Sequence, residues 1–163
     1  MISKTNEKFS RILILPDIRS AVNVGAIFRT ADAVGIDKIY LSGFTPKPTD
    51  QFGRIQKDIA KSALGAENFI PWEYKKSLLA LISKLRKDGY VVIAIEQDDR
   101  AVDYRKVKAS SKVAVIVGPE VTGLPKKILD KCDIIAEIPM YGKKESLNVS
   151  VATGIALFRI LKP

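Results

Sequence analysis

The chain has 163 residues, of which 27 are Lys or Arg and 18 are Asp or Glu, and it contains no histidine. The lack of histidine excludes a His-based catalytic triad, a Cys–His pair and a His-ligated zinc site. The net charge of +9 favours a polyanionic partner. A solvated basic surface without a partner is the alternative, and composition leaves it open.

Length and composition predict one compact domain, spanning residues 1–163. Hydrophobic residues make up 47% of the chain and charged residues 28%, as in soluble globular proteins. The single cysteine, Cys132, has no partner for an intrachain disulfide, and we expect an inert, half-buried thiol. Residues 1–10 lack the apolar core of a secretory signal, and no apolar run is long enough to cross a bilayer. We therefore expect a cytoplasmic protein.

Short β-rich apolar runs alternate with longer helical patterns, which is typical of an α/β fold with a mainly parallel sheet. The apolar runs predict six strands, at residues 11–15, 38–42, 68–71, 90–95, 113–117 and 134–138. The helical patterns that would flank this six-stranded sheet cover residues 21–34, 57–64, 75–87, 125–131 and 147–161. Two connections are longer than simple turns, residues 44–56 and 97–112, and long loops in compact domains are often functional.

The first predicted strand leads into a helix start that matches neither common phosphate-binding motif. A dinucleotide-binding turn or a P-loop would require a glycine-rich pattern that residues 17–31 do not have. We expect Asn23 at the helix cap, Gly25 at a close approach to another backbone, and Arg29 within an otherwise small and apolar helix. An ordinary N-cap for Asn23 and a solvated surface charge for Arg29 are the structural alternatives.

A second polar position follows the buried run 113–117. Gly118 comes directly after it, and Glu120 follows at the carboxyl end of a predicted central strand. Open α/β sheets bind ligands at this edge, so Glu120 is a candidate site residue. A plain strand-turn-helix with an exposed glutamate would show the same pattern.

A third segment, residues 138–154, passes from a strand end through a Gly/Lys loop into a helix. We expect Ser146 to cap that helix. Asn148 and Ser150 require other partners, because polar side chains early in an apolar helix must be satisfied.

These three segments resemble the motifs of the SpoU/TrmH class of RNA ribose methyltransferases, in the SPOUT superfamily. Residues 23–31 are similar to the first motif, 117–124 to the second, and 138–140 with 146–152 to the third, in the expected order. The resemblance implies S-adenosylmethionine as methyl donor and a ribose 2′-hydroxyl of tRNA or rRNA as acceptor. It also implies a homodimer, no metal, and a C-terminal deep trefoil knot.

Carried over residue by residue, the resemblance assigns the site. The catalytic and ribose-handling residues would be Arg29, Asn23, Glu120, Ser146 and Asn148. The residues that contact the cofactor would be Ala94, Gly118, Ile138 and Leu147. Because arginine stays protonated at neutral pH, we expect Arg29 to grip the phosphate beside the target ribose and to stabilise the developing alkoxide, instead of acting as a base.

Basic loop residues are candidates for contacts with RNA phosphates. They are Arg11, Arg19, Arg54, Lys57, Lys61, Arg100, Arg105, Lys106, Lys143 and Lys144. The loop aromatics Phe44, Phe52 and Tyr141 are candidates for base stacking. We expect the catalytic domain alone, with no separate RNA-binding domain.

Two other functions stay open: a knotted RNA-binding or assembly factor without turnover, and a small-molecule-binding α/β domain with an incidental basic surface. The presence of all the motif residues favours the enzyme.

Overall fold

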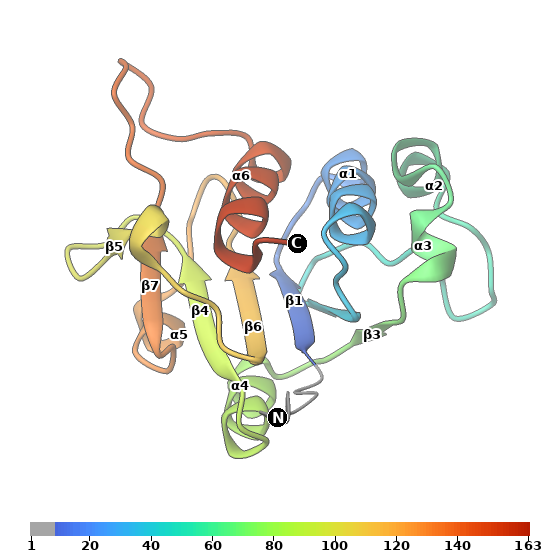
Figure 1. Ribbon diagram of the computed structural model, residues 1–163. Coiled ribbons are helices and arrows are strands. Elements are labelled where there is room, and N and C mark those ends of the chain that lie inside the picture. The colour runs from blue at the N-terminus through green and yellow to red at the C-terminus, as the bar shows by residue number, and fades with distance from the viewer. Residues whose placement is uncertain (1–8) are drawn as a thin grey trace, which may run out of the picture.

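The computed structural model describes residues 9–163, so the expectation about a secretory signal falls largely outside the described residues. Within them, seven strands form one sheet in the order β3-β2-β1-β6-β4-β7-β5, and every strand pairing in it is parallel (Figure 1). The strands are β1 (Ser10–Pro16), β2 (Lys38–Ser42), β3 (Trp72–Tyr74), β4 (Val91–Ile95), β5 (Val102–Asp103), β6 (Lys112–Val117) and β7 (Ile134–Glu137). The predicted α/β class and parallel sheet are confirmed.

Helices cover both faces of the sheet, and each face has its own apolar core. The helices are α1 (Ala21–Ala33), α2 (Lys57–Ala63), α3 (Ala66–Phe69), α4 (Leu78–Lys87), α5 (Lys126–Leu129) and α6 (Val149–Leu161), with a 3₁₀ helix, η1 (Tyr104–Lys106). Helices α1, α2 and α6 lie side by side over one face (Figure 1). The core on that face centres on Phe28, Ile39 and Leu157, and the core on the α4 and α5 face on Ile82, Ile116 and Ile128.

The sheet has seven strands where six were predicted. Residues 68–71, predicted as a strand, form the end of α3 and a turn, and pairing with β2 begins only at Trp72. Pro71 has no N–H to donate to a ladder, and Gly65, with φ of +95°, permits the turn that starts α3. The additional strand, β5, lies inside the predicted loop 97–112, and its two residues are too few to show a period.

Two helix starts differ from the prediction. Ser20 caps α1, and its Oγ accepts a hydrogen bond from the Asn23 N–H at 3.2 Å. Asn148 caps α6, where Ser146 was expected to do so. Both asparagines are thus shifted relative to their predicted places. Asn23 lies in the first turn of a helix, and Asn148 lies at a cap.

A close contact between α1 and α2 fixes the position of α1. A Cβ atom on Gly25 would lie 2.5 Å from the Ile59 carbonyl oxygen and 3.0 Å from the Ala63 nitrogen, so only glycine permits this approach. The predicted role of Gly25 is confirmed. Since α6 packs on the other side of α1, Asn23 near the start of α1 comes close to the start of α6. No helix in residues 9–163 is long and apolar enough to cross a membrane.

Candidate functional site

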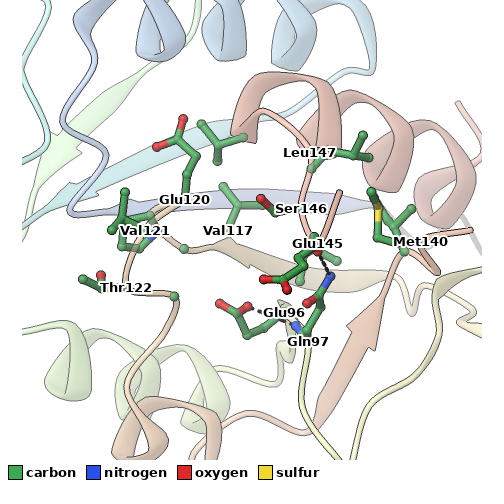
Figure 2. A pocket seen from close by; sticks show the side chains of 17 residues that line it. Glu96, Gln97, Val117, Glu120, Val121, Thr122, Met140, Glu145, Ser146 and Leu147 are labelled. Atoms are coloured by element: carbon green, nitrogen blue, oxygen red, sulfur yellow. Dashed lines mark hydrogen bonds between the residues drawn. The ribbon is translucent and has the colours of Figure 1, made fainter. Parts of the chain in front are cut away.

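Chain segments that follow β4, β6 and β7 meet around a pocket of about 360 Å³ (Figure 2). Its walls come from residues 95–97, from residues 117–123, and from residues between Ile138 and Ala152. All three strands are parallel, so their carboxyl ends lie at the same edge of the sheet. The predicted ligand edge is therefore also the edge that contains this pocket.

The pocket combines apolar walls with negative charge. Ile95, Ile138 and Met140 contribute apolar surface, and Glu96, Glu120 and Glu145 contribute three carboxylates. Among residues 9–163, no lysine or arginine lines it. This lining suits a ligand that has a flat apolar part and at least one positive charge.

Glu96 and Gln97 connect the three walls. One oxygen of the Glu96 carboxylate accepts from the Leu124 N–H at 2.8 Å, and the other accepts from the Gln97 N–H at 3.0 Å. The Gln97 side-chain amide donates to the Glu145 carbonyl oxygen at 2.6 Å (Figure 2). Sequence reasoning did not single out these two residues. Their position directly after a buried strand, at the carboxyl edge, is the signal that could have identified them.

Three motif residues that lie far apart in the sequence form one hydrogen-bonded chain at the pocket rim. The Asn23 side-chain amide donates to Oε1 of Glu120 at 2.7 Å. The Asn148 side-chain amide donates to Oδ1 of Asn23 at 3.2 Å. The Asn148 Oδ1 in turn accepts from the Ser150 N–H at 2.9 Å and from the Ser150 hydroxyl at 2.6 Å. Each motif therefore contributes one member to this chain.

The donor and acceptor atoms of these side chains fix the direction of each hydrogen bond in this chain. An ionised carboxylate only accepts hydrogen bonds, and an amide NH₂ only donates them. Asn23 must therefore point its nitrogen at Glu120 and its oxygen at Asn148, so neither amide is free to flip. The alternative of a plain N-cap at Asn23 is excluded, because Ser20 occupies that position.

The structure places three of the four predicted cofactor residues at the pocket: Gly118, Ile138 and Leu147. The fourth, Ala94, is fully buried in the sheet, and the residues that follow it, from Ile95 on, reach the pocket in its place. Ala94 does not reach the pocket because it lies inside β4, which ends at Ile95, and the pocket opens beyond that end.

Glu120 and Ser146 also line the pocket, whereas Arg29 does not. Ser146 is exposed and forms no hydrogen bond with the described residues. Arg29 is exposed on α1, and within residues 9–163 it forms neither a hydrogen bond nor an ion pair. One copy of the chain does not bring Arg29 to the pocket that Glu120 and Ser146, two other predicted catalytic residues, line.

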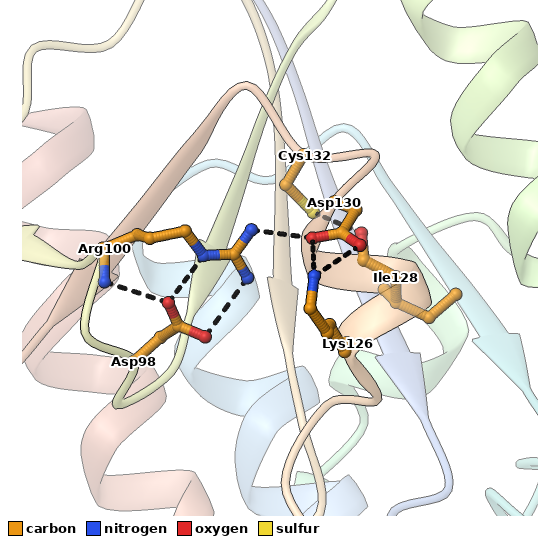
Figure 3. Close-up of polar contacts among 6 residues, drawn as sticks. All are labelled: Asp98, Arg100, Lys126, Ile128, Asp130 and Cys132. Atoms are coloured by element: carbon orange, nitrogen blue, oxygen red, sulfur yellow. Dashed lines mark hydrogen bonds and ion pairs between the residues drawn. The ribbon is translucent and has the colours of Figure 1, made fainter.

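Several of the basic residues predicted to contact RNA phosphates form ion pairs within the chain instead. Arg100 binds both Asp98, at 2.8 Å, and Asp130, at 2.6 Å, and Lys126 also reaches Asp130 (Figure 3). The hydrogen bonds from Arg100 lower the pKa of Asp98 to about 2. Arg105 does the same for Asp103.

Two more of these arginines have partners within the chain. Arg54 pairs with Asp50, and Arg11 donates to the carbonyl oxygens of Val34 and Leu161. The predicted contacts whose side chains form neither an ion pair nor a hydrogen bond with residues 9–163 are Arg19, Lys57, Lys61, Lys106, Lys143 and Lys144.

Cys132 is half-buried, as predicted, and its thiol donates to the Ile128 carbonyl oxygen at 3.3 Å (Figure 3). Burial, with a smaller contribution from Asp133, raises the pKa of the thiol to about 12. The thiol is therefore protonated at neutral pH and has little nucleophilic character.

Comparison with known proteins connects this geometry to a family. The profile of the SpoU rRNA Methylase family matches residues 10–158. A "Putative TrmH family tRNA/rRNA methyltransferase" of Staphylococcus aureus (strain MSSA476) is 32% identical over 159 residues, which is 98% of this chain and 61% of that relative. This chain therefore spans about three fifths of that curated relative.

Two solved structures share the fold. The AdoMet-bound rRNA methyltransferase from Sinorhizobium meliloti is 32% identical, with a TM-score of 0.83 over 92% of this chain and 55% of that one. The A. aeolicus TrmH/SpoU tRNA modifying enzyme is 27% identical, with a TM-score of 0.81 over 95% of this chain and 76% of that one. The match over nearly the whole chain, together with the three motifs that meet in one chain of hydrogen bonds, shows that the chain belongs to the SpoU rRNA methylase family.

Proposed function

We propose that the protein transfers a methyl group from S-adenosylmethionine to a ribose 2′-hydroxyl of a tRNA or an rRNA. The observation that carries this proposal is the chain of hydrogen bonds through Asn23, Glu120 and Asn148 at the rim of an acidic pocket. Support comes from the relatives, whose names describe a tRNA/rRNA methyltransferase, an rRNA methyltransferase and a tRNA modifying enzyme.

The pocket fits S-adenosylmethionine by size and by charge. A volume of about 360 Å³ lies within the range of small-molecule sites. Ile138, Met140 and Leu147 offer apolar surface for an adenine ring. The carboxylates of Glu96, Glu120 and Glu145 suit a molecule that carries a sulfonium and an ammonium group. We assign Gly118, Ile138 and Leu147 to this binding role, and Ile95 in place of Ala94.

The bound cofactor supplies an electrophilic methyl group, so the chain itself has to position the acceptor and release its proton. S-adenosylmethionine, when bound, would give up its methyl group to the 2′-oxygen, and the hydroxyl proton would leave to a phosphate oxygen or to water. Glu120 and Asn148 fix the amide of Asn23 beside the pocket. We assign to the hydroxyl of Ser146, which lines the pocket, the role of holding the ribose. No histidine and no metal are needed for these steps.

We place Arg29 in the active site through a homodimer. Val22 and Arg29 are seven residues apart, about 700° along the helix, so they share one face of α1. Val22 on this face, and Val151, Ile155 and Phe158 on the neighbouring α6, are apolar and exposed. Association of two copies over this apolar face would bury it and would bring Arg29 to the subunit boundary, where it could grip the phosphate beside the target ribose.

The knot, the single domain and the cytoplasmic location belong to the same proposal. β7 lies beyond β4, whereas α6 lies beside α1 over the middle strands of the sheet (Figure 1). Residues 138–148 must therefore return past residues 118–124. A crossing of these two segments is where a deep trefoil knot would form, and both segments line the pocket.

The direct test is methyl transfer to RNA from a strain that lacks the protein. With S-adenosylmethionine labelled in its methyl group, the wild-type chain should label one RNA species, and Asn23→Ala should label it far more slowly. Binding of S-adenosylmethionine is measured in parallel by calorimetry. Cofactor binding without any labelled RNA would contradict the enzyme and favour an RNA-binding factor without turnover.

A further inference from the structure

Two phenylalanines in the connection after β2 are exposed although their backbone is well fixed. The side chain of Phe44 is 76% exposed and that of Phe52 is 72% exposed. The connection leaves the sheet at the carboxyl end of β2, which is the same edge as the pocket. Exposed aromatic rings on ordered backbone do not contribute to the core, so their place in the structure calls for another role.

The position of Phe44 is set by its neighbours at the end of β1. Its N–H donates to the Asp17 carboxylate at 2.9 Å. The next residue, Thr45, is buried, and its hydroxyl donates to the Leu15 carbonyl oxygen at 2.6 Å and accepts from the Ile18 N–H at 3.1 Å. The backbone on both sides of the ring is therefore fixed before any ligand arrives.

The position of Phe52 is set by a tight turn. The Asp50 carboxylate accepts from the N–H groups of Phe52 at 2.8 Å and of Arg54 at 3.0 Å. Gly53 adopts a φ of +76°, which closes the turn. These hydrogen bonds from Arg54 and Phe52 lower the pKa of Asp50, so the turn keeps its charged acceptor at neutral pH.

A cation accompanies each of these rings. The Arg19 guanidinium lies 5.6 Å from the centre of the Phe44 ring, and the Arg54 guanidinium lies 5.2 Å from the centre of the Phe52 ring. A third cation, Lys47, lies 4.2 Å from the Tyr74 ring. Neither Arg19 nor Lys47 forms an ion pair within residues 9–163. Flat rings that alternate with positive charges are typical of surfaces that bind single-stranded nucleic acid.

This surface is continuous with the proposed active site. Arg19 directly precedes Ser20, the cap of α1, and Asn23 lies in the first turn of that helix. We propose that the aromatic surface, formed by Phe44, Phe52, Arg19, Lys47 and Arg54, binds unpaired RNA nucleotides next to the target ribose. Bases stack on the two phenylalanine rings, and phosphates contact Arg19 and Lys47. This inference rests on the proposed function and adds that the substrate is looped or single-stranded RNA, whose bases are free to stack.

The test compares the RNA affinity of variants at the two phenylalanines of the aromatic surface with that of a control variant at a third phenylalanine. Phe44→Leu and Phe52→Leu keep an apolar side chain and remove the ring, and their exposed positions make folding insensitive to the change. Phe9→Leu is the matched control, because the Phe9 ring also lies beside an arginine, at 5.6 Å from Arg11, but just before β1, at the opposite edge of the sheet. Affinity is measured by fluorescence anisotropy with labelled RNA of about 12 nucleotides, single-stranded or as a duplex.

The wild-type chain should bind the single strand more tightly than the duplex. Each substitution on the aromatic surface should weaken single-strand binding at least about fivefold, with little change in duplex binding. Phe9→Leu should leave both affinities unchanged, and no variant should alter the affinity for S-adenosylmethionine.

Unchanged single-strand affinity in the Phe44→Leu, Phe52→Leu double variant would overturn this inference and leave the methyltransferase proposal intact. A change in the oligomeric mass of that variant would also overturn it, because the surface would then be an interface between copies. If the wild-type chain binds neither RNA nor S-adenosylmethionine, the proposed function fails as well.

Discussion

Asn148 divides two tasks between the two polar atoms of its side chain. Its oxygen caps α6 by accepting from the N–H groups of Ser150 and Val151. Its nitrogen donates to Asn23 and so holds the chain of hydrogen bonds that ends at Glu120. An aspartate could take over the cap but not the donation, because both of its oxygens only accept.

The pair Asn148→Asp and Asn148→Ala therefore separates these tasks. We expect Asn148→Asp to keep the free energy of unfolding within about 0.5 kcal/mol of wild type, since Asp and Asn are similar caps, and Asn148→Ala to lower it by about 1 kcal/mol. Both variants should slow methyl transfer at least about tenfold, because Asn23 loses its donor. Urea denaturation and the labelled-methyl assay measure the two effects. Full activity in Asn148→Asp would show that the donation to Asn23 is dispensable.

At the level of single residues, the sequence predicts side chains that carry motifs better than side chains that only support them. Asn23, Glu120 and Asn148 are recognisable, and the structure brings them together. Glu96 and Gln97 are not, because a carboxylate that accepts from backbone N–H groups has no fixed spacing to its partners. Ser20 caps α1 where Asn23 was predicted, and Asn148 caps α6 where Ser146 was predicted. Offsets of two or three residues between polar side chains decide which one caps a helix, and periodicity does not resolve them.

At the level of elements, α1 carries the first motif and is held between α2 and α6. Its distance from α2 depends on Gly25, which lies against the backbone of α2. A shift of α1 would move Asn23 relative to Glu120, so packing at this contact also positions the site.

Two helical glycines make this dependence testable. Gly25→Ala should destabilise the fold by about 1–3 kcal/mol, because the new Cβ overlaps with the Ile59 carbonyl oxygen. Gly154→Ala in α6 is the control, since a Cβ there meets only Thr30, at 3.7 Å, and alanine favours a helix by up to about 1 kcal/mol. Urea denaturation reports both changes. Equal stability of the two variants would contradict the close approach of α1 and α2.

The connection that contains β5 is tied to α5 by Asp98, Arg100 and Asp130 (Figure 3). Because Arg100 lowers the pKa of Asp98 from 3.8 to about 2, the folded state binds this proton more weakly than the unfolded state does. The contribution of Asp98 to stability is therefore present above pH 3.8 and is lost as the pH falls towards about 2.

Asp98→Asn should accordingly lower the free energy of unfolding at neutral pH, and its difference from wild type should shrink as the pH falls through this range. Asp99→Asn is the control, because Asp99 forms no hydrogen bond or ion pair in the described part of the chain. Denaturation series at several pH values give the comparison. A difference that persists at low pH would mean that the carboxylate charge of Asp98 is not the cause.

Prediction of the elements succeeded where apolar runs were long. The strands that became β1, β4 and β6 are buried on both faces along most of their length, so they read as nearly continuous apolar runs, and β2 and β7 contain shorter buried apolar stretches. The strands β3 and β5 have only three and two residues, and neither buries a complete face. These edge strands exist because their residues pair with β2 and β7, and the periodicity of the sequence gives no information about such pairing.

For the whole molecule, the apolar face of Val22, Val151, Ile155 and Phe158 is the proposed contact between two copies. Phe158→Glu places a charge in its middle and should convert a dimer to a monomer, because desolvating a charge costs more than the apolar contact contributes. Light scattering coupled to gel filtration measures the mass. Val102→Glu, at a partly exposed position on β5, should leave the mass unchanged.

If the site is completed at the subunit boundary, monomeric Phe158→Glu should lose methyl transfer, because Arg29 would no longer be held at that boundary beside the active site. A monomeric variant with wild-type turnover would contradict the dimeric site.

The global charge of +9 predicted a polyanionic partner, but it could not show which cations are available. The structure distinguishes the paired cations from the others. Arg100 and Arg105 bind carboxylates of their own loops, while Arg19 forms no ion pair with the described residues. A knot, likewise, is a property of the path of the chain and leaves no trace in composition or periodicity. The family resemblance alone made it an expectation.

The central claim, methyl transfer to a ribose hydroxyl without histidine or metal, is tested most directly by the chemical identity of the product. RNA methylated by the wild-type protein in the presence of a chelator is digested to nucleosides, and the labelled nucleoside is identified by mass spectrometry. We predict a single 2′-O-methylated nucleoside, with the added mass on the sugar fragment. A methyl group on the base, or a reaction that stops when metal is removed, would contradict this account.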